Sequence, residues 1–377
     1  MTRLILPIVA LTALFIAACS ANDTNTEVDS VETSVATPTT VPSIAVSPSP
    51  SPTPAAAPIP VGPAGAATGK PVDLSALPLL IMEHERLIER TAEAMGLGRV
   101  AVAWLASEKT APIEALAAGQ ADFAACELIP FLVAASAEPA APNAIDPTAI
   151  RALGALTRRP YVLVTRNPAV RTIRDFGPSD RIALPALKLS GPAVMLDMAA
   201  AREWGIEEHH RLARLAVAMP DDSAAASLLA GTGGITAHFS RMPYVDRELA
   251  DPAISRVIDS FDIAGMHSTA VLAATMRFRD ANSELCKAVL SALQQAGEFI
   301  GKSPGAAAEI FAGMATDDDT PPEDLADMIG DPDLVYDAAP AGVMRIAEFM
   351  HRTGRLARRP SDRREMFLPE SRDLAGS

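Results

Sequence analysis

Cysteine, aromatic residues and positive charge are all scarce in this chain of 377 residues. Three cysteines are too few for a disulfide framework or for a zinc site with four thiolate ligands. Aromatic residues make up 4% of the chain, and with abundant alanine this favours small-residue helices of an α or α/β protein. The chain has 32 Lys and Arg residues and 46 Asp and Glu residues. Its net charge of −14 is too acidic for a general binder of the nucleic-acid backbone. Hydrophobic residues make up 49%, and the length allows two domains at roughly 100 to 200 residues each.

The first 19 residues have the composition of an export signal. Arg3 supplies a positive charge, and the apolar run from Leu4 to Ala18 is shorter than the ~20 residues that a helix needs to span a bilayer. The Ile-Ala-Ala sequence before Cys19 resembles the bacterial lipobox, whose cysteine is lipidated and becomes the first residue of the mature protein. An ordinary signal peptide cleaved at a nearby alanine is the alternative. Both interpretations predict export, and we predict a signal peptide over residues 1–19 with lipidation of Cys19.

Residues 20–70 are rich in Ser, Thr, Pro and Ala and contain almost no large apolar side chain. Such a segment buries too little surface to offset its chain entropy, and the alternating prolines of residues 47–54 favour extended polyproline II. We predict a disordered tether with a reach of roughly 3 Å per residue, which holds the folded part away from a membrane.

The folded part contains a strand–helix–strand unit that occurs twice. The first has a strand over 99–105, a helix over 110–118 and a strand over 121–125, and the second has them over 212–219, 222–230 and 235–239. Each helix ends at a glycine, Gly119 or Gly231, and the short turns favour parallel strands. Chance similarity between alanine-rich helices is the alternative to a true repeat.

Further segments extend each unit to a β-α-β-α-β half. A first strand over 72–79 and a helix over 81–95 precede the first unit, and a strand over 181–185 and a helix over 191–204 precede the second. Strands over 152–156 and 161–165, and later over 257–263 and 269–275, predict two extended crossings between the halves, before a long helix over 282–301. We therefore predict lobe one over 71–164, lobe two over 165–262 and a return to lobe one over 263–377, with a hinge between the lobes.

A set of short motifs recurs in a characteristic order over most of residues 78–368. They are Leu87–Arg90 with Ala94–Leu97, Glu114–Leu116 with Gly119, Asp122-Phe123, Ile173–Phe176, Ala230-Gly231 with His238–Ser240, and Pro340–Met344 with Phe349-Met350, Gly354 and Pro360. In this order they resemble the extracytoplasmic solute-binding proteins of ABC importers, specifically the nitrate, sulfonate and taurine group. One departure is that the family opens with a clean apolar strand, whereas Pro78 interrupts residues 71–80, which puts contacts from a first strand in doubt.

The resemblance implies a periplasmic-binding-protein-like α/β fold: two α/β lobes joined by two crossover segments (type II), with a ligand cleft between them. It also implies that the protein binds a small solute by hinge closure and delivers it to a membrane permease and its ATPase. A monomer without cofactor is implied, anchored to a membrane only through its N-terminal lipid and facing the periplasm or the cell exterior.

Ligands of open parallel sheets bind beyond the carboxyl ends of the strands, near helix N-termini. This selects, with one histidine on the return crossing, Ser107, Thr110, Glu127, Lys188, Ser190, Gly191, Asp221, His238 and His267. Lys188 beside Ser190 suits an oxyanion, whereas Asp221 repels an anion and suits an amine, so a ligand with an acidic and an amine end reconciles them. The structural alternatives are helix caps for Ser190 and Asp221 and a packed or hydrogen-bonded His238.

The main alternative is an enzyme of hydrolase or pyrimidine-precursor type on the same frame. Neither a G-x-S-x-G elbow nor an H-E-x-x-H helix occurs in the sequence, so no catalytic residue, metal site or cofactor is predicted. A solute-sensing lipoprotein without a transporter keeps the fold and changes only the partner. Cys126 and Cys286 are predicted as buried free thiols.

Overall fold

The computed structural model describes residues 59–61, 74–105, 111–137, 150–314 and 320–376. The predicted signal peptide, Cys19, Ser107 and Thr110 lie outside these ranges. Within them, no helix combines the length and the apolar character needed to cross a bilayer.

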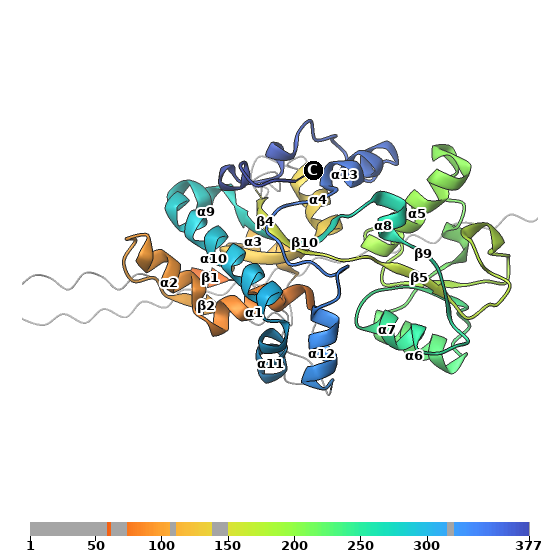
Figure 1. Cartoon of the computed structure of the whole chain (residues 1–377). Helices are drawn as coiled ribbons and strands as arrows, with labels where there is room; N and C mark the ends of the chain where they lie inside the picture. Colours follow the sequence, from red (N-terminus) through yellow and green to blue (C-terminus); the bar gives the residue numbers. More distant parts are fainter. Residues whose placement is uncertain (1–58, 62–73, 106–110, 138–149, 315–319, 377) are drawn as a thin grey trace, which may run out of the picture. The chain divides into compact units, whose positions relative to one another are not determined.

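Two five-stranded sheets share one plan (Figure 1). The first has the order β2-β1-β3-β10-β4 and consists of β1 (Ile59–Val61), β2 (Val102–Trp104), β3 (Phe123–Glu127), β4 (Ile150–Arg158) and β10 (Ser268–Thr275). The second has the order β7-β6-β8-β5-β9 and consists of β5 (Val162–Thr165), β6 (Ile182–Leu184), β7 (Ala216–Ala218), β8 (Ala237–Ser240) and β9 (Ser255–Asp259). In each sheet four strands run in one direction, and the fourth strand of the order, β10 or β5, is antiparallel to both of its neighbours. The predicted repeat and the two α/β lobes are confirmed.

Two adjacent segments carry the chain between the sheets. The first joins β4 to β5 and the second joins β9 to β10, so each sheet receives its antiparallel strand from a chain that has just left the other sheet. Tyr161 N donates to Ser260 Oγ at 2.9 Å, and Ser260 N donates to Tyr161 O at 2.8 Å. The Oγ1 atoms of Thr157 and Thr269 lie 3.0 Å apart. The crossings are therefore hydrogen-bonded to each other along the predicted hinge.

Helices cover both faces of each sheet. They are α1 (Leu77–His84), α2 (Leu87–Ala94), α3 (Pro112–Ala117), α4 (Leu128–Ser136), α5 (Gly191–Trp204), α6 (Asp221–Ala230), α7 (Tyr244–Leu249), α8 (Ser260–Ala264), α9 (Met276–Ala281), α10 (Ser283–Lys302), α11 (Pro304–Met314), α12 (Pro322–Ile329) and α13 (Val343–Arg352). Side chains of successive strand residues point to opposite faces. Along β10, accordingly, Ala270 and Leu272 pack in the core with α1, α10 and α11, while Val271 and Ala273 pack in the core with α4 and α13. In the second lobe α6 and α7 lie side by side (Figure 1).

The predicted first strand over 72–79 is wrong. A 3₁₀ turn over Leu74–Ala76 leads into α1, and Pro78 occupies its first turn, where a missing N–H costs nothing. Leu77 and Leu79 through Met82 are all buried, and a helix that is apolar on every side has the same composition as a buried strand. The strand that pairs with β2 and β3 is instead β1, which lies inside the range predicted as tether.

Other boundaries also move. The helix predicted over 81–95 is two helices, broken where Arg86 adopts a left-handed conformation with φ of 50°. β5 pairs in the second sheet, so the chain leaves lobe one before residue 162 rather than at 164. The segment predicted as a strand over 257–263 ends its strand at Asp259 and continues as α8.

Candidate functional site

The two sheets contact each other where β3 and β8 end. Glu127 is the last residue of β3, and Arg241 directly follows the last residue of β8. The Nη1 atom of Arg241 lies 3.7 Å from Oε1 of Glu127, whose side chain is 51% exposed. Because β3 and β8 hold the same place in their sheets, this ion pair joins equivalent points of the two lobes.

A buried chain of charged groups supports Arg241 from within lobe two. Its Nε donates to Oδ2 of Asp221 at 2.7 Å. Nε2 of His238 lies 3.4 Å from Oδ1 of Asp221, and Nδ1 of His238 lies 2.7 Å from Oε1 of Glu248. The side chains of Asp221, His238 and Glu248 are all buried. We call these four residues (Asp221, His238, Arg241 and Glu248) the charged chain.

The protonation of the charged chain follows from its geometry. Both ring nitrogens of His238 face carboxylate oxygens, which accept hydrogen bonds. Only a doubly protonated ring carries an N–H on each nitrogen and can donate to both. Burial lowers the pKa of His238, but the hydrogen bonds and charges of Asp221 and Glu248 outweigh it, so the pKa is raised above 6.5. Burial likewise raises the pKa of Asp221, and its contacts with His238 and Arg241 reverse the balance and lower it below 3.8. Asp221 is therefore ionised and holds Arg241 in place.

A second guanidinium lies beside the end of β8. Arg159 is 2% exposed, belongs to the first crossing, and donates from Nη1 to the carbonyl oxygen of Met242 at 3.2 Å. Ser240 is fully buried, and its Oγ has no hydrogen-bond partner among the residues that the structure describes. Arg159, Ser240 and Arg241 therefore bring two cations and a hydroxyl group to the same strand end. Neither arginine was among the site residues predicted from the sequence, although Arg241 directly follows the end of β8.

The other predicted residues of lobe two separate into two places. Oγ of Ser190 accepts from the N–H of Ala193 at 3.3 Å and donates to the carbonyl of Ala186 at 2.7 Å, so Ser190 caps α5. A Cβ atom on Gly191 would overlap the ring of Tyr161, which packs against the start of α5. Lys188 is exposed and lines a separate pocket, described below.

His267 lies on the second crossing, directly before β10. Its Nε2 lies 2.8 Å from Oγ of Ser260, its Nδ1 lies 3.2 Å from the carbonyl oxygen of Ser268, and its ring stacks on Tyr161 with centroids 6.2 Å apart. Burial lowers the pKa of His267 to about 4, so the ring is neutral, with Nδ1–H donating and Nε2 accepting. The structure thus connects His267 to the crossings and not to the charged chain.

Neither metal nor thiol chemistry is indicated in the described part of the chain. None of its His, Cys, Asp and Glu side chains form a group of three that could hold a metal ion. Cys126 and Cys286 are buried and free, and burial raises the pKa of each thiol to about 12. A thiol with such a pKa is not a nucleophile at neutral pH.

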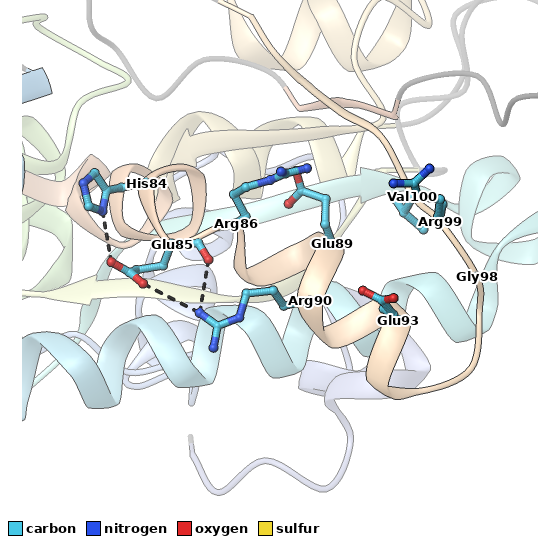
Figure 2. Close-up of a pocket in the computed structure, with 9 residues that line it drawn as sticks. All are labelled: His84, Glu85, Arg86, Glu89, Arg90, Glu93, Gly98, Arg99 and Val100. Atoms are coloured by element: carbon cyan, nitrogen blue, oxygen red, sulfur yellow. Dashed lines mark hydrogen bonds and ion pairs between the residues drawn. The ribbon is translucent and has the colours of Figure 1, made fainter.

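Figure 2 shows a charged pocket of about 440 Å³ on α1, α2 and the chain before β2. Its acidic side chains, Glu85, Glu89 and Glu93, are matched in number by its arginines, Arg86, Arg90 and Arg99. Nε of Arg86 lies 3.4 Å from Oε1 of Glu89, and Nη1 of Arg90 lies 3.7 Å from Oε2 of Glu85. Since the acidic and basic groups pair with one another, this pocket shows no preference for a ligand of either charge.

Comparison with known proteins identifies the fold. No family model matches the chain, and neither does any curated protein. Among solved structures, the aliphatic sulphonate-binding protein SsuA from Escherichia coli is 15% identical, with 82% of this chain and 97% of that chain covered and a TM-score of 0.61. The alkanesulfonate-binding SsuA from Xanthomonas axonopodis pv. citri, bound to MOPS, is 17% identical over 80% of this chain and 94% of that chain, with a TM-score of 0.56. The periplasmic nitrate-binding protein NrtA from Synechocystis PCC 6803 is 14% identical over 79% and 82%, with a TM-score of 0.55. The resemblance found in the sequence is thus confirmed at the level of the fold: this chain has the two-lobed α/β fold of the periplasmic sulfonate- and nitrate-binding proteins.

Proposed function

We propose that the chain is an extracytoplasmic solute-binding protein of an ABC importer, which closes two lobes on a small solute and delivers it to a membrane permease. The observation that carries the proposal is the meeting of equivalent strand ends at the Arg241–Glu127 ion pair, beside a hinge of two hydrogen-bonded crossings. Strand ends that face each other across a hinge place a ligand in contact with both lobes. The similar structures are of proteins that bind sulfonates or nitrate, which supports the same class of solute here.

The proposed ligand carries one anionic group, such as a sulfonate or nitrate, that binds Arg241. Two features favour this group over Glu127 as the partner of Arg241. The 3.7 Å separation exceeds that of a charge-assisted hydrogen bond, and Glu127 is half exposed, whereas Asp221 holds the other side of the guanidinium at 2.7 Å. Arg159 adds positive charge, and the hydroxyl of Ser240 adds a donor. An amine at the far end of a taurine-like solute would then pair with the displaced Glu127 carboxylate.

Export follows the same proposal. The signal over residues 1–19, lipidation at Cys19 and the part of the predicted tether that precedes β1 hold the binding lobes in the periplasm or at the cell exterior, attached to a membrane by lipid. The partners are a small-molecule solute, a permease and its ATPase; nucleic acid is excluded by charge, and the protein acts as a monomer without cofactor.

The test is calorimetric titration with nitrate, methanesulfonate, taurine and MOPS, after a thermal-shift screen. We expect Arg241→Ala to weaken binding by about 10- to 100-fold, the range for a lost charge-assisted hydrogen bond. The control is Arg174→Ala, because Arg174 is an exposed residue of the same lobe whose ion pair, with Glu203, stays within that lobe. Replacing Glu127 by Gln removes the carboxylate that competes for Arg241, so methanesulfonate should bind more tightly than it binds to the parent protein. Taurine loses the partner of its amine, so its affinity should fall relative to that of methanesulfonate.

Two results would contradict the proposal. One is that none of the anions raises the melting temperature or gives a heat of binding in the titration. The other is an Arg241→Ala variant that binds them as well as the parent protein does. Turnover of chromogenic esters by a protein that binds none of these anions would instead favour the enzyme alternative.

A further inference from the structure

A second pocket, of about 600 Å³, lies between lobe two and residues 353–355, which belong to the segment predicted to return to lobe one. Its walls are the loop between β6 and α5, one side of α5, the chain leading into β7, and residues 353–355 after α13. Apolar side chains, among them Leu187, Leu189 and Leu196, line much of it. No residue of the charged chain contributes to the described lining. This pocket is therefore a candidate site separate from the one proposed above.

The mouth of this pocket combines exposed apolar surface with positive charge. Leu187 and Leu189 are 48% and 45% exposed, although most large apolar side chains of the described residues are buried. Lys188 lies between them, and none of the described carboxylates forms an ion pair with it. Exposed leucines that flank a lysine present an apolar surface and a cation side by side.

Deeper in the pocket, the one carboxylate is already neutralised. Asp197 is buried and forms an ion pair with Nη2 of Arg355. The same guanidinium donates from Nη1 to Oγ1 of Thr353 at 3.0 Å and from Nε to the carbonyl oxygen of Lys188 at 3.3 Å. With Asp197 paired to Arg355, Lys188 supplies an uncompensated positive charge, and the ring of His210 adds a polar group to the lining. The pocket therefore favours an anion over a cation.

From this lining we propose a second ligand site that takes an apolar monoanion, an aliphatic or aromatic body with a single carboxylate group. Lys188 binds the carboxylate at the mouth, and Leu187, Leu189 and Leu196 cover the apolar body. The volume is within the range of about 300 to 1,000 Å³ typical of small-molecule pockets. Its described lining shares no residue with the charged chain, which is proposed to bind the cleft solute.

The experiment uses octanoate as the probe and the full chain carrying Cys19→Ser, so that no attached lipid competes. We expect calorimetry to detect octanoate binding, and octylammonium and octanol to bind at least tenfold more weakly. Lys188→Glu and Leu189→Glu should each weaken octanoate binding at least tenfold. Leu249→Glu is the matched control, because Leu249 is also an exposed leucine of lobe two, at 40%, but lies outside the pocket.

Arg241→Ala separates this proposal from the function proposed above, since it removes the anion group of the cleft and leaves this pocket intact. Octanoate binding should survive that substitution and should also survive saturation with a cleft solute. The second site is refuted if the Cys19→Ser chain without further substitution does not bind octanoate, or if it binds octylammonium equally well. It is also refuted if Lys188→Glu leaves octanoate binding unchanged. Loss of octanoate binding in Arg241→Ala would move octanoate into the cleft and refute the second site as well.

Discussion

Replacing His238 by Ala tests whether the charged chain is held together by a protonated histidine. The substitution leaves Asp221 and Glu248 buried with one partner fewer each, and Oε1 of Glu248 loses the histidine that lies 2.7 Å away. Breaking a buried charge pair by removing one partner costs about 3–5 kcal/mol. We therefore expect the free energy of unfolding to fall by about that amount near pH 6.

The pH dependence gives the prediction its sign. Because the pKa of His238 is raised in the folded state above its unfolded value of 6.5, the stability from its protonation is fully present below pH 6.5. That stability is lost as the pH rises through the folded pKa. The difference between the parent protein and His238→Ala should thus be larger at pH 6 than at pH 9. Asp221 does not interfere, since its pKa is lowered below 3.8 and its contribution changes only at more acidic pH.

His267 changes the free energy of unfolding with pH in the opposite direction to His238. Its contribution is removed by comparing the variant with the parent protein at each pH. Burial in the folded protein lowers the pKa of His267 from 6.5 to about 4. As the pH drops below 6.5, His267 is protonated in the unfolded chain only, and the free energy of unfolding falls by about 3 kcal/mol at most. His238 contacts Asp221 and Glu248, whereas His267 contacts Ser260 and Ser268, and effects of separate sites add. The slope from His267 therefore cancels when the variant is compared with the parent at each pH.

The assay is urea unfolding followed by circular dichroism at pH 6, 7.5 and 9. His84→Ala is the control, because the side chain of His84 is 50% exposed and surface substitutions change stability by no more than about 0.5 kcal/mol. The reasoning is refuted if His238→Ala costs less than about 1 kcal/mol at pH 6, or if its cost is the same at pH 6 and pH 9.

Two further predictions concern packing and reactivity. Gly191→Ala should destabilise the protein by about 1–3 kcal/mol, because the new methyl group overlaps the ring of Tyr161. Gly305→Ala is the control, because no atom lies within 4 Å of the position of its new methyl group. Equal unfolding curves for the two variants would contradict the prediction. Cys126 and Cys286, with thiol pKa values raised to about 12 by burial, should react with a thiol reagent only after unfolding, and rapid labelling of the native protein would show otherwise.

Much of the fold was predictable because it is repeated and locally patterned. The helix over 191–204 was predicted with its observed bounds, since Ser190 caps it and Gly205 ends it. The strands that became β10 and β5 were recognisable as short apolar runs rich in β-branched residues. Where the pattern was ambiguous, the prediction failed: residues 77–82 are apolar on every side, and β1, with three residues, is too short to show a period.

The candidate site was only partly predictable. The rule of strand ends selected Glu127, Asp221 and His238, which the structure brings together through Arg241. It also selected Ser190, whose hydroxyl is engaged in capping its own helix, since a cap and a ligand contact have the same residue type at the same position.

The two similar halves are evident from the amino-acid sequence alone, because helix ends, strand alternation and repeated order are encoded within short windows. The sequence also places the carboxylate of Asp221 at a helix start. Only the tertiary structure decided that Arg241 spans from Asp221 to Glu127 and that Arg159 joins it. These residues are far apart in the chain, and the low dielectric and exact spacing that make their charges matter exist only after the two sheets have formed.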